Sequence, residues 1–505
     1  MNTFMNQLKN DTNYKYTENG GIAHKSTNSA VYDLFAFGSA YRKRSDDDCI
    51  LLFKNALEEN TELAMKCLFW IRDCRGGAGE RRFFRTCIKW LAKEHPEIIK
   101  RNLNFIPEMG RWDDLYELVD STLENDIFDI IKIQLEKDMK DIMSGKSNIG
   151  ISLLAKWLKS ENASSVETKR LAKKTRKALG VSAKTYRKTL SNLREHIKVL
   201  ERLMSEGRWE EIDFSKIPSK AGLMYRNAFA RRDIIAEKYK AFAKDKTSKV
   251  NAATLYPYEI VEKARKLFSS SKDSTERLMV NKYWDSLPDY FNGANCNMMC
   301  VVDTSGSMIG TPIDVAISLG MYCAERLNGA FHNNYISFSS SPQLINIAGI
   351  DFVDKVHRIY KTNLCDNTNL VAVFDLLLSI ARHPEVKKED IPNTIVVISD
   401  MEIDEGTSMG WWYSKKDNMS RWTKETAATE MEAVRQKWAS YGFELPRLIY
   451  WNVESRNSNT ILDSGPNVSF VSGFSPTIFK SVLTGKNGYQ LMIETICAEK
   501  YQSIK

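Results

Sequence analysis

The sequence predicts two domains, an α-helical domain at the N-terminus and an α/β domain with a parallel β-sheet at the C-terminus. Three observations support this fold class. Apolar residues in the first half recur at helical spacing, and after about residue 295 short β-rich runs alternate with helical stretches. A chain of 505 residues is also too long for one ordinary core. We assign residues 1–290 to the helical domain and residues 296–505 to the α/β domain.

Three apolar stripes predict helices of the first domain. They run through residues 83–91, 127–142 and 186–200, and within each the apolar side chains recur three or four positions apart. Pro96 and Pro107 lie between the stripes, where they do not interrupt a helix. Each stripe therefore predicts a helix with one buried face.

A short motif occurs twice in this helical region. "GRWDDLYEL" begins at Gly110 and "GRWEEIDFS" begins at Gly207, and both follow a predicted helix. The glycine suits the end of one helix, and the two acids suit the start of the next. Two copies about a hundred residues apart indicate stacked helical units.

Three apolar runs, "CNMMCVV", "NTIVVIS" and "RLIYWNV", predict strands of the second domain. Polar side chains follow two of them: Asp303, Ser305 and Ser307 after the first, and Asp400 after the second. Thr368 precedes a predicted helix in the connection between these strands. Ligand sites in open parallel sheets form at the carboxyl ends of strands, so we expect these loops to converge.

The chemistry of these five side chains suits a hard divalent cation. Hydroxyl and carboxylate oxygens are ligands for Mg²⁺ and, next, for Mn²⁺, and they lack the soft donors that select zinc or copper. With few carboxylates, the cation keeps excess positive charge and an open position for an acidic ligand or water. The structural alternative is a capped helix start, because Ser and Thr commonly accept hydrogen bonds from free backbone N–H groups.

In type and order, the five residues resemble the metal-ion-dependent adhesion site (MIDAS) of von Willebrand factor A domains. This resemblance assigns the first metal-binding loop to Asp303, Ser305 and Ser307, the second to Thr368 and the third to Asp400. It covers roughly residues 296–485. It implies a doubly wound, Rossmann-like α/β domain that binds Mg²⁺ or Mn²⁺.

The string "RDCRGGAGERRFFR", residues 72–85, interrupts a helical pattern with three glycines. Exposed N–H groups flanked by arginines can bind phosphate, but the nucleotide-binding motif GxxxxGK[ST] does not occur in this string. We expect instead a tight turn between two helices, held by Arg–Asp or Arg–Glu pairs.

Together with "GRWDDL", this string resembles a family of uncharacterised proteins that join a helical domain to a C-terminal von Willebrand A domain. In architecture these proteins are similar to the Ro autoantigen (TROVE-domain) proteins. In Ro proteins, HEAT-like helical repeats form a ring that an A domain closes, and the ring binds small and misfolded RNAs in a ribonucleoprotein. For this chain the resemblance implies a helical ring and RNA binding.

A basic stretch gives independent support for RNA. Residues 168–202 contain about a dozen Lys and Arg against two Glu, the clustering that neutralises phosphates. We expect the contacts to come from Lys169, Arg170, Lys173, Lys174, Arg176, Lys177, Lys184, Arg187, Lys188, Arg194 and Lys198. On the predicted helix 186–200 the basic side chains should face outward. The alternative is a solvated helical surface without a nucleic-acid partner.

Charge, hydropathy and cysteine content indicate the compartment in which the protein works. The formal net charge of +8 is modest, so the distribution of charge matters more than its sum. We find no apolar run long enough to cross a bilayer, and the first residues lack the apolar centre of a secretory signal. Nine scattered cysteines, with one CxxxC pair and no nearby histidines, argue against zinc and indicate reduced thiols in a cytoplasmic protein.

These observations support three possible functions to different degrees. An RNA-binding scaffold with a divalent-metal site comes first. The alternative is a metal-dependent protein–protein assembly module without nucleic acid, in which an acidic side chain of a partner completes the coordination. An enzyme comes last: Asp303 and Asp400 with a metal could activate water, but HExxH, GxSxG and a dense carboxylate cluster do not occur. We therefore expect no enzymatic activity.

Overall fold

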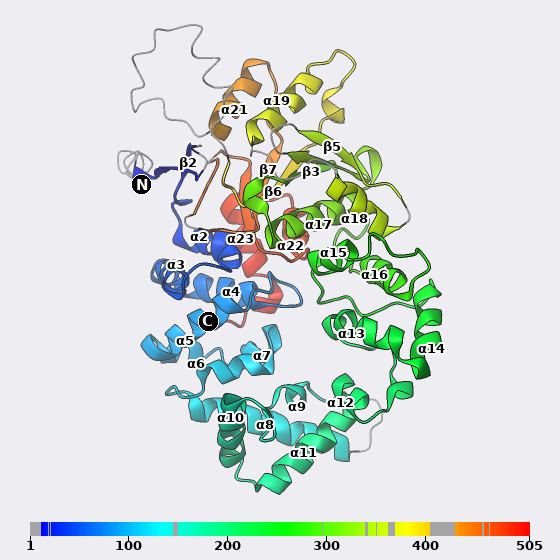
Figure 1. Cartoon of the computed structure of the whole chain (residues 1–505). Coiled ribbons are helices and arrows are strands. Elements are labelled where there is room, and N and C mark those ends of the chain that lie inside the picture. Colours follow the sequence, from blue (N-terminus) through cyan, green and yellow to red (C-terminus); the bar gives the residue numbers. More distant parts are fainter. Residues whose placement is uncertain are drawn as a thin grey trace.

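The computed structural model describes residues 12–18, 20, 22–144, 150–294, 296–338, 342–349, 351–361, 369–403, 430–456, 459–463 and 465–505. Across these residues the chain forms an arc of helices followed by an α/β domain (Figure 1). No helix among them is both long enough and apolar enough to span a lipid bilayer. Their eight cysteines are all free thiols.

The arc consists of helices that pack mainly on helices close to them in the sequence (Figure 1). Its first half contains α2 (Ala30–Phe37), α3 (Asp46–Glu59), α4 (Thr61–Arg72), α5 (Arg82–Glu94), α6 (Pro96–Lys100), α7 (Phe105–Met109), η2 (Trp112–Leu118), α8 (Glu124–Met143) and α9 (Leu154–Trp157). Its second half contains α10 (Val166–Ala178), α11 (Ala183–His196), α12 (Leu200–Ser205), η3 (Trp209–Glu211), α13 (Ser219–Arg231), α14 (Asp233–Lys244), α15 (Pro257–Arg265) and α16 (Thr275–Asp285). The helical N-terminal region predicted from the sequence is confirmed.

The predicted apolar stripes correspond to these helices with one difference. Residues 83–91 lie in α5 and residues 127–142 lie in α8, as predicted. The third stripe does not form a single helix, because α11 ends at His196 and α12 begins at Leu200. Lys198 between them has a φ of 46°, a left-handed conformation that breaks the helix. Leu200 is buried all the same, because α12 packs its own apolar side inward.

Both copies of the Gly-Arg-Trp motif form a 3₁₀ turn after a helix. The first gives η2 after α7, and the second gives η3 after α12. Gly207 has a φ of +76°, which suits a helix end. Gly110 has a φ of −109° and is required for space, since a Cβ atom there would lie 2.3 Å from Oδ2 of Asp114.

The α/β domain contains a six-stranded sheet in the order β5-β4-β3-β6-β7-β8. The strands are β3 (Met298–Asp303), β4 (Asn334–Phe338), β5 (Gln343–Asn346), β6 (Thr394–Ser399), β7 (Arg447–Asn452) and β8 (Val468–Ser472). Edge strand β5 is antiparallel to β4, and all other neighbours are parallel. Counted along the chain this order is 3-2-1-4-5-6, that of a Rossmann-like doubly wound sheet.

Helices cover the sheet and bury it. The domain contains α17 (Thr311–Arg326), α18 (Phe352–Lys361), α19 (Leu370–Ala381), α21 (Glu430–Ser440), α22 (Ile478–Val482) and α23 (Gly488–Ile496). Every residue of β3 and β6 is buried, as expected for apolar strands at the centre of a covered parallel sheet. Helix α17 packs on β3, β4 and β6. Gly320 permits this close approach, because a Cβ atom there would lie 2.5 Å from Cγ2 of Val302.

The N-terminal segment packs on the α/β domain although the sequence assigns it to the helical one. Strands β1 (Tyr14–Tyr16) and β2 (Ile22–His24) form an antiparallel pair, and His24 makes a further bridge to Ile461. Helix α2 packs on β8, where the hydroxyl of Tyr32 accepts a hydrogen bond of 2.9 Å from the backbone N–H of Phe470. Segments near both ends of the chain therefore pack in the α/β domain.

The glycine-rich loop of residues 73–80 joins the two ends of the arc and the end of the chain. Buried Asp73 accepts hydrogen bonds from Lys500 Nζ at 2.5 Å and from the Tyr501 hydroxyl at 2.7 Å. Thr477 donates to the carbonyl oxygen of Gly77 at 2.6 Å. Tyr256, just before α15, donates to the carbonyl oxygen of Gly79 at 3.0 Å. The arc thus closes on itself at this loop, through residues far apart in sequence.

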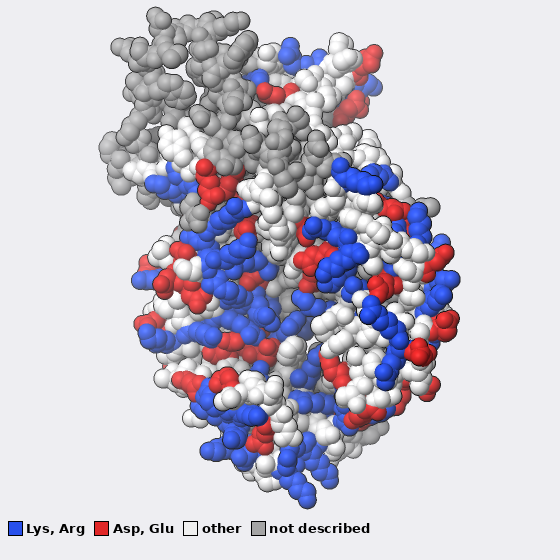
Figure 2. Space-filling model, in the orientation of Figure 1, with Lys and Arg blue, Asp and Glu red and all other residues white. Residues whose placement is uncertain are grey.

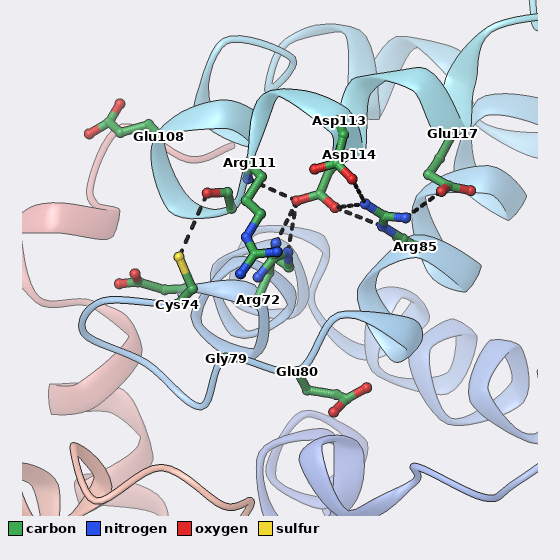
Figure 3. Close-up of polar contacts among 12 residues, drawn as sticks. Arg72, Cys74, Gly79, Glu80, Arg85, Glu108, Arg111, Asp113, Asp114 and Glu117 are labelled. Carbon is green, nitrogen blue, oxygen red and sulfur yellow. Dashed lines mark hydrogen bonds and ion pairs between the residues drawn. The ribbon is translucent and has the colours of Figure 1, made fainter. Parts of the chain in front are cut away.

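An ionic network braces the same loop from the other side (Figure 3). Asp114, fully buried, accepts hydrogen bonds from Arg72 at 2.7 Å and pairs with Arg85 at 2.6 Å. Arg85 also pairs with Asp113 at 2.9 Å and with Glu117 at 2.6 Å. The prediction of a tight turn held by Arg–Asp and Arg–Glu pairs is confirmed.

The far end of the arc is attached by a second set of polar contacts. Arg277 of α16 pairs with Asp351 at 2.8 Å and with Asp354 at 2.5 Å. Trp284 stacks on Phe352 with ring centroids 4.2 Å apart. Helix α15 packs on α17 and α18. Both ends of the arc are therefore held by the α/β domain, as the sheet and helices of Figure 1 illustrate.

Candidate functional site

A polar site lies where the strand order of the sheet reverses, between β3 and β6. Asp303 is the last residue of β3, and Asp400 directly follows β6. These two strands are parallel neighbours, so their carboxyl ends open on the same edge. The connections leave this point in opposite directions, and the resulting crevice is where doubly wound sheets bind ligands.

The first loop of the site folds around Asp303. Its Oδ1 accepts a hydrogen bond of 2.9 Å from the backbone N–H of Ser305, and its Oδ2 accepts one of 2.5 Å from the hydroxyl of Ser399. The hydroxyls of Ser305 and Ser307 lie 3.0 Å apart. The Asp-x-Ser-x-Ser spacing thus places two hydroxyls beside one buried carboxylate.

Asp400 brings a second carboxylate to this loop. Its Oδ1 accepts a hydrogen bond of 3.2 Å from the backbone N–H of Glu402. Its Oδ2 is buried and accepts no hydrogen bond from a described residue. Burial and the carboxylate of Asp303 raise the pKa of Asp400 to about 7, against the opposing effects of the Glu402 N–H, Arg456 and Ser307. Asp400 is therefore a buried carboxylate with few polar partners, close to the carboxylate of Asp303.

Three charged residues that the sequence did not single out complete the surroundings. Arg456 lies 3.4 Å from Oδ2 of Asp400 and 3.6 Å from Oε2 of Glu454. Lys43, from the N-terminal segment, pairs with Glu454 at 2.8 Å. Arg456 and Glu454 follow β7, so the carboxyl end of a third strand contributes to the site. The string "ESR" directly after the predicted strand "RLIYWNV" was the available signal.

The donor set fits a hard divalent cation. It comprises two carboxylates and two hydroxyls, all oxygen ligands, and no described residue donates a hydrogen bond to Oδ2 of Asp400. A cation would offset the repulsion between the two acids, which the raised pKa of Asp400 reflects. In the described part of the chain no three His, Cys, Asp or Glu residues form a metal-binding cluster, so hydroxyls would have to supply the remaining ligands.

Of the five predicted metal ligands, the structure brings four together. Asp303, Ser305, Ser307 and Asp400 line one site at the sheet edge. Thr368 lies outside the described residues, so its position stays a prediction.

A second candidate surface lies on α10 and α11, midway along the arc and at the end of the molecule opposite the sheet (Figure 1). Six predicted RNA-binding residues on these helices are exposed and form no ion pair with a described residue. These residues, the α10–α11 cation row, are Lys169, Lys173, Lys177, Lys184, Arg187 and Lys188. Lys and Arg side chains are prominent at this end of the space-filling view (Figure 2). Lys198 is also exposed, in the turn that follows.

Other residues of the basic stretch are engaged within the protein. Arg170 pairs with Asp120 at 2.7 Å, and Lys174 pairs with the same carboxylate at 2.5 Å. Arg176 pairs with Glu161 at 2.8 Å. These three side chains connect helices of the arc, so their charges are already balanced.

The prediction that the basic side chains of this region face outward is wrong for Arg194. It is partly buried and donates hydrogen bonds to the carbonyl oxygens of Ala155 at 2.9 Å and Leu158 at 2.8 Å, and to the hydroxyl of Ser160 at 2.9 Å. Burial lowers the pKa of its guanidinium. Helix α9 ends beneath α11, and Arg194 satisfies its free carbonyl groups, a contact that periodicity alone does not reveal.

Family models match two consecutive parts of the chain. The family model described as Domain of unknown function (DUF2828) matches residues 17–132 and 146–291, just over half of the chain. A second model, Domain of unknown function (DUF7788), matches residues 297–502.

Two individual proteins are similar along most of the chain. Uncharacterized protein L728 of Acanthamoeba polyphaga mimivirus is 29% identical over 511 residues, which cover 94% of this chain and 85% of that protein. The crystal structure of the Ro (RSR) protein of Deinococcus radiodurans aligns with 94% of this chain and 100% of its own, at 12% identity and a TM-score of 0.40. A score this low describes a loose likeness, and nothing below depends on it.

Proposed function

The chain belongs to the family described as Domain of unknown function (DUF2828), and we propose that this member is an RNA-binding scaffold with a divalent-metal site. In this proposal the helical arc binds the RNA backbone. The α/β domain closes the arc and holds Mg²⁺ or Mn²⁺ as a von Willebrand A domain does at its adhesion site. The protein would then act as part of a ribonucleoprotein and not as an enzyme.

The α10–α11 cation row is the observation that supports RNA binding. Its six side chains project from two consecutive helices, and no carboxylate of the described residues neutralises them. Lys169, Lys173 and Lys177 recur every fourth residue on α10, and Lys184 and Lys188 do so on α11. Residues four apart share a helix face, so these cations form rows that can follow a line of phosphates.

The test is to neutralise this row without touching the paired cations. We would replace Lys169, Lys173, Lys177, Lys184 and Lys188 by Gln and measure binding of a single-stranded RNA by fluorescence anisotropy across a salt titration. The logarithm of the binding constant should depend less steeply on the logarithm of the salt concentration. The magnitude of this slope should fall by about 3 to 4, since each phosphate contact on a single strand contributes roughly 0.7. Lys174 and Arg176 are left intact, because they hold the arc together.

The matched control replaces five exposed cations of the α/β domain by Gln. These are Arg358, Arg382, Lys387, Lys388 and Lys486. The net charge changes equally in both variants, so a non-specific charge effect would weaken RNA binding equally. Equal affinity and slope in the row variant and the wild type would refute the RNA assignment of this surface.

The oxygen-rich site at the sheet edge supports the second part of the proposal. Asp303, Ser305, Ser307 and Asp400 would hold the ion, and the bound cation would supply an open position for an acidic ligand. This chain's own contribution is to keep two carboxylates and two hydroxyls together at a buried sheet edge. We propose no catalytic role for the two acids, and RNA cleavage that disappears with Asp303→Ala would contradict this.

A metal-dependent protein assembly module without nucleic acid is the second candidate. The buried Oδ2 of Asp400 favours it, because no described residue donates a hydrogen bond to this oxygen, and a buried carboxylate oxygen at the sheet edge suits a cation better than RNA. The discriminating measurement is partner capture from cell extract with and without a chelator, using wild type and Asp303→Ala. Capture of an RNA-free partner that requires both metal and Asp303 would favour this candidate. Capture that ignores both would remove it.

A further inference from the structure

The guanidinium of Arg456 occupies an unusual place at the proposed metal site. Its side chain is 30% exposed, whereas those of Asp400 and Glu454 are 0% and 5% exposed. It lies 3.4 Å from Asp400 on one side and 3.6 Å from Glu454 on the other. Both distances fit ion pairs, but the structure places no hydrogen bond between Arg456 and Oδ2 of Asp400. Arg456 is therefore shared between two acids and tightly bound to neither.

Glu454 is held in a position where it can pair with Arg456. Its carboxylate is anchored by Lys43, which approaches Oε1 at 2.8 Å and Oε2 at 3.1 Å. The two acids thus offer Arg456 alternative partners on either side of one rotatable side chain. A small rotation of its flexible stem would carry the guanidinium from Asp400 toward Glu454.

A divalent cation and an arginine compete for the same carboxylate. The acid pair Asp303 and Asp400 needs positive charge nearby, because two adjacent buried carboxylates repel each other. Without a metal, Arg456 is the cation that the structure places against Asp400. With a metal bound to Asp400, a guanidinium 3.4 Å from the same oxygen would be repelled by a double positive charge.

We propose that Arg456 is a built-in counter-ion that competes with the divalent metal for Asp400 and moves to Glu454 when the metal binds. This inference rests on the metal site of the proposed function. It assigns to Arg456 a positioning role: it balances the acids in the metal-free protein and weakens metal binding. A displaced Arg456 stays at the rim of the site, where it can pair with the acidic ligand that the metal accepts.

The experiment measures metal affinity directly in the full chain. Mn²⁺ binding is followed by electron paramagnetic resonance, and Mg²⁺ by competition, in wild type, Arg456→Gln and Arg456→Lys. Removing the charge in Arg456→Gln should tighten Mn²⁺ binding about tenfold, and Arg456→Lys should stay near wild type because it keeps the charge. Arg382→Gln, at an exposed arginine of the same domain, serves as the matched control and should change nothing.

A double-mutant cycle tests the exchange of partners. Glu454→Gln removes the alternative partner of Arg456, so Arg456 should remain on Asp400 and Mn²⁺ binding should weaken. In the Arg456→Gln background the same Glu454 change should have a clearly smaller effect, since there is no guanidinium left to redirect. Additive effects of the two substitutions would contradict the exchange. If Arg456→Gln fails to fold, the Glu454→Gln single variant still tests the proposal, and unchanged Mn²⁺ affinity in that variant would contradict it.

The outcomes separate this inference from the proposed function. If wild type binds Mn²⁺ and Arg456→Gln binds it with the same affinity, the competing role of Arg456 is wrong and the metal site stands. If neither binds Mn²⁺ while both are folded by circular dichroism, the metal site fails and this inference fails with it. If only Arg456→Gln binds, both are supported.

Discussion

Gly79 shows how much a single residue contributes to the closure of the arc. Its φ is +72°, which an L-residue adopts only with strain, and a Cβ atom would lie 2.2 Å from the hydroxyl oxygen of Tyr256. Gly180 has a similar φ of +66° with no atom within 4 Å of its Cβ position. The two glycines therefore share the backbone requirement and differ only in the neighbour.

This pair gives a prediction for stability. Gly180→Ala should lower the free energy of unfolding by about 1 kcal/mol, the strain of a left-handed alanine. Gly79→Ala should cost a further ~2 kcal/mol, because Tyr256 must move away from the loop. Urea unfolding followed by circular dichroism measures both. Equal losses would mean that Tyr256 yields without cost and that its contact with the loop does not hold the arc.

At the proposed metal site, residue types in sequence order were enough to select Asp303, Ser305, Ser307 and Asp400. They were not enough to find Arg456 or Glu454, because a charged residue after a strand is common and its direction depends on the packing of neighbouring loops. The contact of Glu454 with Lys43 joins residues more than four hundred positions apart. No local pattern encodes such a pair.

At the scale of elements, α10 and α11 carry basic residues of two kinds: some are exposed, and others contact neighbouring parts of the arc. Lys188 is exposed on α11, whereas Arg194 on the same helix satisfies the end of α9. Helical periodicity places both away from the buried stripe, but only contact with α9 distinguishes them. The same contact explains why the basic stretch is partly structural.

This difference predicts opposite effects of two similar substitutions. Arg194→Gln should lower the free energy of unfolding by about 2 kcal/mol or more, since buried carbonyl oxygens lose charged donors. Lys188→Gln should change it by less than about 0.5 kcal/mol but should weaken RNA binding. Urea unfolding and anisotropy, run on both variants, check the two effects. A stable Arg194→Gln variant with lost RNA affinity would reverse the assignment.

The strands illustrate the limit of pattern recognition at this scale. β3, β6 and β7 were found because each is a continuous apolar run at the buried centre of the sheet. β5 was not found, since it is a short edge strand whose residues Gln343, Leu344 and Asn346 are exposed. β8 was not found either, because its sequence "VSFVS" contains two serines, although every residue of this edge strand is buried.

At the scale of the whole molecule, the loop of residues 73–80 holds the helical arc and the end of the chain together. Asp73 accepts hydrogen bonds from Lys500 and Tyr501, and Gly77 from Thr477. These contacts link the arc to the α/β domain in addition to the packing of α15 on α17. The closed arrangement therefore depends on a few buried polar contacts of very long range.

Tyr501→Phe should loosen this closure without disturbing the core. The substitution keeps the ring and removes the 2.7 Å hydrogen bond to buried Asp73. Amide hydrogen exchange in residues 73–80 should become faster by about tenfold, because local opening leaves one fewer contact to break. Tyr489→Phe, at an exposed tyrosine of α23, should leave exchange in this loop unchanged. Unaltered exchange in Tyr501→Phe would show that the Tyr501 hydroxyl does not help to hold the loop.

The sequence by itself determined the two-part fold class, the three most apolar strands, and the oxygen-rich residues that follow two of them, because these features are written in local spacing and residue type. Only the tertiary structure decided that the arc closes at the glycine-rich loop, that the N-terminal segment packs on the sheet, and which basic residues are paired. The physical reason is that burial and ion pairing depend on groups brought together across hundreds of residues. A local pattern can supply the charge, but only the folded chain supplies its partner.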